Sequence, residues 1–161
     1  MVTLSSIRAA VAAVVDPEIR VITIEDLGIL RDVSMQDGRV LVTITPTYSG
    51  CPAMDVIRAD VADAARRAGA VDVDVRTVLS PAWSTDRISA DGRAKLAAAG
   101  IAPPGPVRSS GPVPVTIGIT VQCPRCGSTD TQELSRFGST ACKSLRRCRS
   151  CTEPFDHIKA F

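Results

Sequence analysis

Four cysteines in the C-terminal third of the sequence have the spacing of a metal site. They form two CxxC pairs, Cys123-Pro-Arg-Cys126 and Cys148-Arg-Ser-Cys151, which are separated by 21 residues. Two intervening residues allow both sulfurs of a pair to reach one ion, and two such pairs supply the four thiolates of a tetrahedral zinc site. Because no ligand position stays open, such a site holds structure and does not catalyse hydrolysis. We therefore predict one structural zinc ion, bound by Cys123, Cys126, Cys148 and Cys151.

The spacing leaves alternatives for these cysteines. They could be unligated thiols or redox pairs, although a double CxxC in a reducing compartment is more typical of a metal site. A four-cysteine tetrahedron also accepts iron, as in a rubredoxin-like centre. Cys142 is the extra cysteine of this region. We interpret it as a spare thiol, and the alternative is a labile or substitute metal ligand.

A separate cysteine, Cys51, lies in a loop that turns at Gly50 and enters a predicted helix at Pro52. Unpaired backbone N–H groups at a helix N-terminus stabilise a thiolate, which is a soft-metal ligand or a nucleophile. The alternative is a small buried residue that happens to be cysteine. As a catalytic nucleophile Cys51 lacks a nearby base, because the only histidine, His157, is close to the C-terminal end of the sequence.

Three carboxylates, Asp16, Glu18 and Asp26, lie beside expected turns. Capping and turn formation account for Asp16 and Asp26. In a functional role, these carboxylates would line the same edge of the domain as Cys51 and support it.

The elements around Cys51 predict an α/β fold of the α+β kind, in which helices pack on a small mixed sheet. Apolar residues at helical spacing predict a first helix that starts at Ser5 or Ser6 and ends at Asp16-Pro17. Residues 29–35 and 39–45 predict two strands joined by a tight turn at 36–38.

The rest of the first domain continues this alternation of helices and strands. A second helix is predicted at about 52–68, with Gly69 as its stop. The strictly alternating residues that follow predict a strand with Val71, Val73 and Val75 on the inner face, and a third helix is predicted at 86–99.

A change of composition divides the chain. Residues 101–114 contain five prolines and no periodic pattern, which is typical of a semi-rigid linker. We predict a first domain at 1–102, a Pro/Gly-rich linker at 103–114 and a small β zinc ribbon at 115–161. The ribbon is too small to fold without its ion. Its short strands are predicted at Val115–Val121, Gln132–Phe137 and His157–Phe161.

The overall composition limits the partners and the location. The 161 residues are 45% hydrophobic and 22% charged with a net charge of +2, which gives no general attraction to nucleic acid or membrane. Arg146, Arg147 and Arg149 invite a nucleic-acid interpretation, but no aromatic residues are interleaved for base stacking. No apolar stretch approaches the roughly 20 residues of a membrane span. Without a signal peptide pattern, we expect a cytoplasmic protein.

Several motifs resemble the MIP18-type (DUF59) domain. The resemblance covers residues 1–104 and implies a role in iron–sulfur cluster assembly, with the loop cysteine, Cys51, as the residue implicated. The segments that carry it are Asp16-Pro-Glu-Ile19, Ile24-Glu-Asp-Leu-Gly28, Thr47-Tyr-Ser-Gly-Cys-Pro-Ala-Met54, Trp83-Ser-Thr-Asp86 and Gly100-Ile-Ala-Pro-Pro104.

The C-terminal ribbon makes this resemblance specific to a smaller family. With Phe137-Gly-Ser-Thr-Ala-Cys-Lys143 and Cys151-Thr-Glu-Pro-Phe155, the chain is similar to the PaaD family, the small accessory subunits of bacterial phenylacetyl-CoA epoxidase. The resemblance implies a role in aerobic phenylacetate catabolism, with separate oxygenase and reductase subunits as partners. The sequence agrees with that division, because it has no Glu-x-x-His di-iron motif, no GxGxxG and no ferredoxin cysteine pattern.

We therefore expect a non-catalytic maturation subunit. Cys51 would transiently hold iron or an iron–sulfur cluster, while the ribbon would dock the recipient. One alternative is a structural subunit of the oxygenase complex that transfers no metal, and another is an enzyme with a cysteine nucleophile. A cluster held by one cysteine per chain needs further ligands, and a homodimer that pairs two Cys51 loops would supply them.

Overall fold

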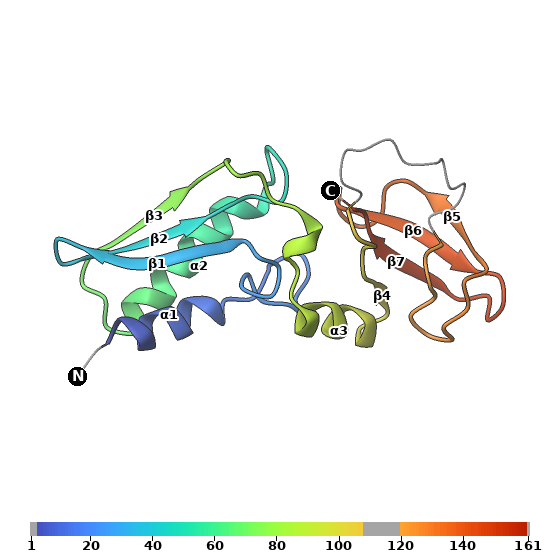
Figure 1. Ribbon diagram of the computed structural model, residues 1–161, viewed down its shortest axis with the longest axis horizontal. Helices are drawn as coiled ribbons and strands as arrows, with labels where there is room; N and C mark the ends of the chain where they lie inside the picture. Colours follow the sequence, from blue (N-terminus) through green and yellow to red (C-terminus); the bar gives the residue numbers. More distant parts are fainter. Residues whose placement is uncertain (1–2, 108–119, 161) are drawn as a thin grey trace. The chain divides into compact units, whose positions relative to one another are not determined.

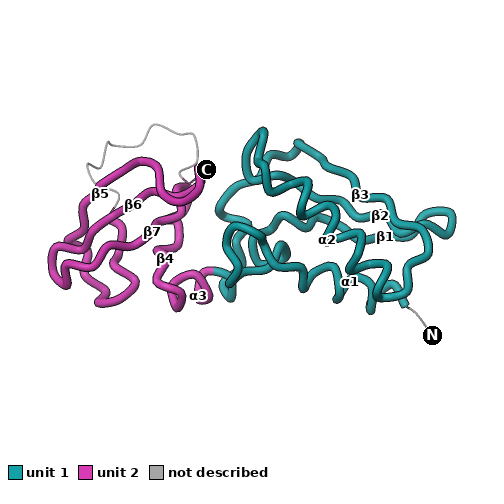
Figure 2. Tube along the Cα trace, turned by 180° about the vertical axis from the view of Figure 1, so that it is seen from behind, with its two compact units in different colours: residues 1–92 teal, residues 93–161 magenta. Residues whose placement is uncertain are grey.

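The structure, a computed structural model, describes residues 3–107 and 120–160 (Figure 1). The chain divides into two compact units, residues 1–92 and 93–161 (Figure 2). Each contains a small mixed sheet, so the predicted α+β class is confirmed. Within the described residues, no helix is both long and apolar enough to cross a membrane.

The first unit is built on a three-stranded sheet. Strand β2 (Arg39–Ile44) lies in the middle, antiparallel to β1 (Leu30–Gln36) and parallel to β3 (Val73–Thr77). The tight turn between β1 and β2 contains Asp37 at φ 51° and Gly38 at φ 80°. Two successive positive φ values suit the twist of a two-residue hairpin, so the predicted hairpin is confirmed.

Two helices cover one face of this sheet, as Figure 1 shows. Helix α1 (Leu4–Ala12) contributes Ile7 and Val11 to the core, and α2 (Ala53–Arg67) contributes Ile57 and Val61, all at most 2% exposed. Spacings of three or four residues place each pair on the same helix face, which is why the pattern was visible in the sequence.

Three details predicted for residues 1–102 are wrong. Helix α1 starts from a capping box on Thr3 instead of Ser5 or Ser6 and ends at Ala12, because Val15 pairs with Thr23 in an isolated bridge. Val71 is 98% exposed, since the chain still turns there and β3 starts only at Val73. The third helix is split into a short 3₁₀ turn and the helix α3, and these span Thr85–Arg87 and Ala90–Ala98.

The second unit contains the ribbon, a four-stranded sheet in the order β4-β7-β6-β5. Its outer strands are β4 (Ile101–Ala102) and β5 (Thr131–Ser135), and its inner strands are β6 (Lys143–Cys148) and β7 (Pro154–Ile158). Strand β6 was not predicted, and β7 begins before the predicted strand at 157–161. The strand predicted at 115–121 lies almost entirely outside the described residues.

The division into units differs from the boundary that composition predicts at 103–114. The second unit begins at Arg93, and Ile101 and Ala102 pair in parallel with Asp156 and His157 of β7. By composition these two residues belong to the Pro-rich stretch at the end of the predicted first domain. Their hydrogen-bonding partner lies more than 50 residues away, which local composition does not reveal.

Candidate metal centre

Each CxxC pair lies in a tight turn of the second unit. In the first turn the Cys123 N–H donates to the Ser128 carbonyl and the Gly127 N–H donates to the Cys123 carbonyl, both at 2.9 Å. The second turn follows β6, and the Cys148 N–H donates to the Glu153 carbonyl at 3.0 Å. Gly127 has a φ of 75°, a conformation that glycine adopts without strain.

The four sulfurs of these turns lie close together. All of them are within 4.8 Å of one another, with 3.8 Å between Cys123 and Cys151 and 3.5 Å between Cys126 and Cys148. Zinc–sulfur bonds of about 2.3 Å in a tetrahedron place the sulfurs about 3.8 Å apart. The donor set and its spacing therefore fit one four-coordinate metal ion.

The electrostatics of the cluster favour a bound cation. The backbone N–H of Cys151 donates to Cys148 Sγ at 3.4 Å and lowers the pKa of Cys148 to about 6. The N–H of Glu153 lowers the pKa of Cys151, but burial and the neighbouring sulfurs raise it to about 12. Four thiolates at this distance repel one another, so a divalent cation is needed for all four to be ionised.

The cluster is part of the small core of the ribbon. Cys123 and Cys148 are at most 1% exposed and pack with Ala102, Val121 and Phe155. One aromatic and a few small side chains bury little apolar area, so a bound ion would supply much of the stability of this unit. The spacing of the cysteines does not point to Val121 or Phe155 as their neighbours, although a large aromatic residue four positions after the last cysteine is a signal for such a contact.

Cys142 lies apart from this cluster. It is half-buried, its Sγ is 3.0 Å from Thr140 Oγ1, and among the described residues only the four CxxC cysteines form the ligand group. The structure gives Cys142 no place among the ligands. Its interpretation as a spare thiol stays a prediction.

The loop of Cys51 joins β2 to α2 in the first unit. The chain turns at Gly50 with a φ of 83°, the Cys51 N–H donates to the Tyr48 carbonyl, and the Met54 N–H donates to the Cys51 carbonyl. Helix α2 starts at Ala53, so half-buried Cys51 lies just ahead of its first turn. A small cavity of about 100 Å³ lies beside the loop, with Tyr48 and Trp83 in its wall.

The three carboxylates form no group of potential metal ligands with Cys51 among the described residues. Asp16 is 6% exposed, and its Oδ1 accepts the N–H groups of Glu18 and Ile19 at 2.9 and 2.7 Å. Asp26 Oδ1 accepts the hydroxyl of Ser89 at 3.1 Å. Across residues 3–107 and 120–160, no group of three or more potential metal ligands includes Cys51. Asp16 and Asp26 thus serve turns, and a supporting role of the three carboxylates toward Cys51 stays a prediction.

His157 is the only histidine of the sequence. It is buried in β7 of the second unit, whereas Cys51 belongs to the first unit. His157 is 8% exposed, and its Nδ1 lies 3.3 Å from Ser144 Oγ. Burial, together with the nearby positive charge of Arg146, lowers the pKa of His157 to about 4. The ring is therefore neutral at neutral pH.

This lowered pKa predicts a pH dependence of stability. Since the unfolded chain binds the proton at a pKa of about 6.5 and the folded chain only at about 4, acid favours unfolding between these values. Between pH 6.5 and pH 5 the wild type should lose about 1–2 kcal/mol more than His157→Gln. Urea titrations of both proteins in excess zinc measure this difference. Any loss of metal at low pH affects both proteins alike and therefore cancels in the comparison. Equal losses would contradict the expectation.

Two family models match the chain. Residues 116–159 match the PaaD zinc beta ribbon domain, and residues 4–78 match an iron–sulfur cluster assembly protein family. A protein of Escherichia coli, named as one of the subunits of 1,2-phenylacetyl-CoA epoxidase, is 43% identical over 153 residues, which cover 95% of this chain and 90% of the relative.

The first unit has further relatives. The Fe-S protein maturation auxiliary factor YitW of Bacillus subtilis is 38% identical over 52% of this chain and 83% of its own. The crystal structure of a DUF59 domain from Bacillus anthracis is 29% identical, with a TM-score of 0.52 over 57% of this chain and 89% of that one. A conserved hypothetical protein from Thermotoga maritima is also 29% identical, with a TM-score of 0.50 over 59% of this chain and 94% of that one.

Proposed function

Since the chain belongs to the PaaD family of phenylacetyl-CoA epoxidase subunits, we propose that it is a non-catalytic accessory subunit of such an epoxidase. In this proposal it works in the cytoplasm beside the oxygenase and reductase subunits and assists the assembly or delivery of an iron or iron–sulfur centre. The sequence likeness covers both units, so it concerns the combination of the assembly-type domain with the ribbon and not either part alone.

The position of Cys51 is the observation that carries this proposal. The thiol lies ahead of the first turn of α2, where backbone N–H groups lack partners within the helix. It is half-buried and therefore partly accessible. A single thiolate supplies one ligand to the cargo, and the others would come from the recipient protein or from a second copy of this chain.

The four-cysteine cluster has a different role in this proposal. Cys123, Cys126, Cys148 and Cys151 would hold a zinc ion, which links the two turns and keeps the ribbon folded. With four protein ligands the ion offers no open position for a substrate. Transfer of the cargo through Cys51 exchanges one ligand for another and leaves the oxidation state of the iron unchanged.

Replacement of Cys51 by serine tests the proposal. The Cys51→Ser chain should keep its zinc and its fold, lose any iron and sulfide found after anaerobic purification, and support epoxidase activity at least ten-fold less than wild type. The matched control is Cys142→Ser, which removes another half-buried thiol outside the ligand cluster. It should behave as wild type in both metal analysis and activity assays with the oxygenase and reductase subunits.

Other outcomes would favour the other functions. A fully active Cys51→Ser chain that co-purifies in fixed stoichiometry would contradict metal delivery and indicate a structural subunit. Rapid labelling of Cys51 by an electrophile would not by itself indicate an enzyme, because a cargo-binding thiolate labels as well. Turnover of a substrate by the isolated chain would indicate an enzyme.

A further inference from the structure

Two segments of the first unit, one at the start of β1 and one after β3, are held against each other. They are residues 27–31 and 81–87, which we call the arginine seam. Trp83 Nε1 donates to the Leu27 carbonyl at 2.8 Å. Gly28 approaches Arg87 so closely that an added Cβ would lie 2.6 Å from Arg87 Cβ. The two segments therefore form one packed region.

Arg31 is anchored in the arginine seam by neutral groups. Its Nε donates to Thr45 Oγ1 at 2.8 Å, and its Nη2 donates to the Pro81 carbonyl at 2.6 Å. Its third nitrogen, Nη1, has no hydrogen-bond partner among the described residues, and it does not belong to their buried unpaired atoms. This nitrogen is therefore accessible, while the other two contacts fix the orientation of the guanidinium.

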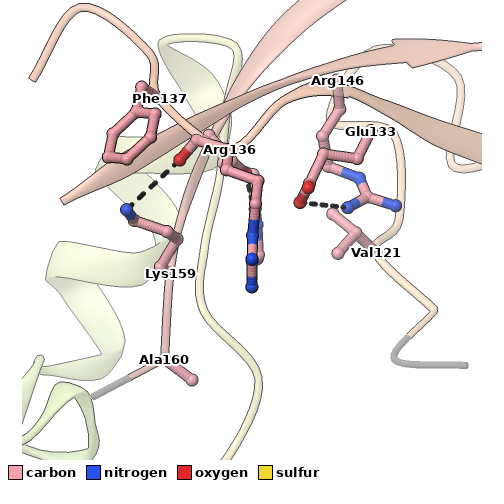
Figure 3. A pocket seen from close by; sticks show the side chains of 9 residues that line it. Val121, Glu133, Arg136, Phe137, Arg146, Lys159 and Ala160 are labelled. Carbon is pink, nitrogen blue, oxygen red and sulfur yellow. Dashed lines mark hydrogen bonds and ion pairs between the residues drawn. The ribbon is translucent and has the colours of Figure 1, made fainter. Parts of the chain in front are cut away.

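Arg87 adds a second positive charge to the seam. It is exposed, and in the described part of the chain no carboxylate forms an ion pair with Arg87 or Arg31. Burial lowers the pKa of Arg31, and the positive charge of Arg87 lowers it further. In the ribbon, by contrast, Arg146 pairs with Glu133 at 3.6 Å in the wall of a cavity of about 610 Å³ (Figure 3). Because the two charges of the seam are uncompensated, an anionic group is attracted to it.

A small cavity connects the seam with the Cys51 loop. Thr45 and Trp83 line this cavity of about 100 Å³ together with Ser49, which is two residues from Cys51. Leu79, 65% exposed, lies in the same wall. Pockets for whole small-molecule ligands have volumes of about 300–1,000 Å³, so this cavity admits a single side chain and not a nucleotide. A protein segment fits this combination of cationic seam, side-chain cavity and exposed leucine.

We propose that the arginine seam binds an acidic segment of the protein that exchanges cargo with Cys51. A carboxylate of the segment lies against Arg31 Nη1 and the Arg87 guanidinium, and a neighbouring side chain covers Leu79. Planar guanidinium groups bind carboxylates in a defined geometry, so the seam orients the partner as well as attracting it. The identity of the partner rests on the proposed function, whereas the preference for a carboxylate beside Cys51 does not.

Disulfide exchange at Cys51 tests this proposal on the full chain. Short peptides carry one cysteine activated as a disulfide with thiopyridine, and the Cys51 thiolate releases thiopyridone as it forms a disulfide with the peptide. Half of the peptides have Asp or Glu at varied distances from this cysteine, and the matched half have Asn or Gln there. The chain carries Cys142→Ser, and mass spectrometry identifies Cys51 as the modified residue. Acidic peptides should react about three-fold faster or more at low salt, and this difference should vanish at high salt.

Substitutions in the seam show whether its two arginines cause the preference. Arg87→Glu and Arg31→Gln should each remove most of the difference between acidic and amide peptides. Arg67→Glu makes the same change of charge as Arg87→Glu at an exposed position in the last turn of α2, and it should keep the difference. Trp83 fluorescence during urea unfolding shows whether each variant keeps the seam folded, because Trp83 is part of it.

Several outcomes would overturn the proposal. They are equal rates for acidic and amide peptides, no reaction at Cys51, and a preference that survives both seam substitutions. Inorganic phosphate that abolishes the preference at matched ionic strength would also overturn it, because the seam would then be a site for small anions. Failure of the metal-delivery proposal leaves these rates unchanged, since disulfide exchange needs no iron, so the two failures are distinguishable.

Discussion

Replacing Cys148 with serine should release the metal ion and unfold the ribbon while the first unit stays folded. Cys148 is fully buried, receives the N–H of Cys151 and provides one of the four sulfurs. Structural zinc sites contribute on the order of 10 kcal/mol to folding, and a three-ligand remnant retains little of this. Zinc should fall from about one per chain to nearly none, as elemental analysis measures, and the amides of β5, β6 and β7 should lose protection from hydrogen exchange.

Two built-in controls make this experiment specific. Cys142→Ser should keep the full zinc content, because its sulfur is not in the cluster. The only tryptophan, Trp83, lies in the first unit and donates to the Leu27 carbonyl at 2.8 Å, so its fluorescence reports the folding of that unit. A Cys148→Ser chain that retains zinc and ribbon protection would show that the cluster does not hold the fold.

Replacing Gly28 with alanine should destabilise the first unit by about 2–4 kcal/mol. Gly28 has a φ of 71°, and an added Cβ would lie 2.6 Å from Arg87 Cβ and 2.8 Å from the Arg87 carbonyl oxygen. Both the backbone strain and the clash raise the free energy of the folded state. Urea unfolding followed by Trp83 fluorescence measures the effect close to the site.

Gly38→Ala is the matched control for this substitution. Gly38 has a similar φ of 80°, but nothing lies within 4 Å of an added Cβ. This variant should lose only about 1 kcal/mol from the backbone strain. If Gly28→Ala is no less stable than Gly38→Ala, the close approach of Arg87 is not a constraint on the fold.

Local patterns in the sequence were sufficient for much of the fold and for the metal ligands. The CxxC spacing identified the four cysteines that the structure brings within 4.8 Å, because two intervening residues make a turn whatever surrounds it. The hairpin at Asp37-Gly38 and the stop of α2 at Gly69 depend on positive φ values, which a few neighbouring residues specify.

Other features depended on contacts between distant segments. Val71 continues an alternating pattern but is exposed, because the pairing of β2 with β3 starts at Val73 and Val40. Ile101 and Ala102 look like the start of a linker, yet they form a strand on β7. Periodicity shows which residues could be buried, whereas pairing decides which of them are.

The two functional regions show the same distinction. Residue type and local sequence determined the cluster of four sulfurs and placed Cys51 just ahead of α2. Only the tertiary structure decided that Asp26 accepts a hydrogen bond from the distant Ser89, and that Arg136, Phe137, Arg146 and Lys159 surround one pocket. A turn that carries two metal ligands is formed by a few neighbouring residues. The wall of a pocket, in contrast, comes from strands that meet only when the sheet has formed.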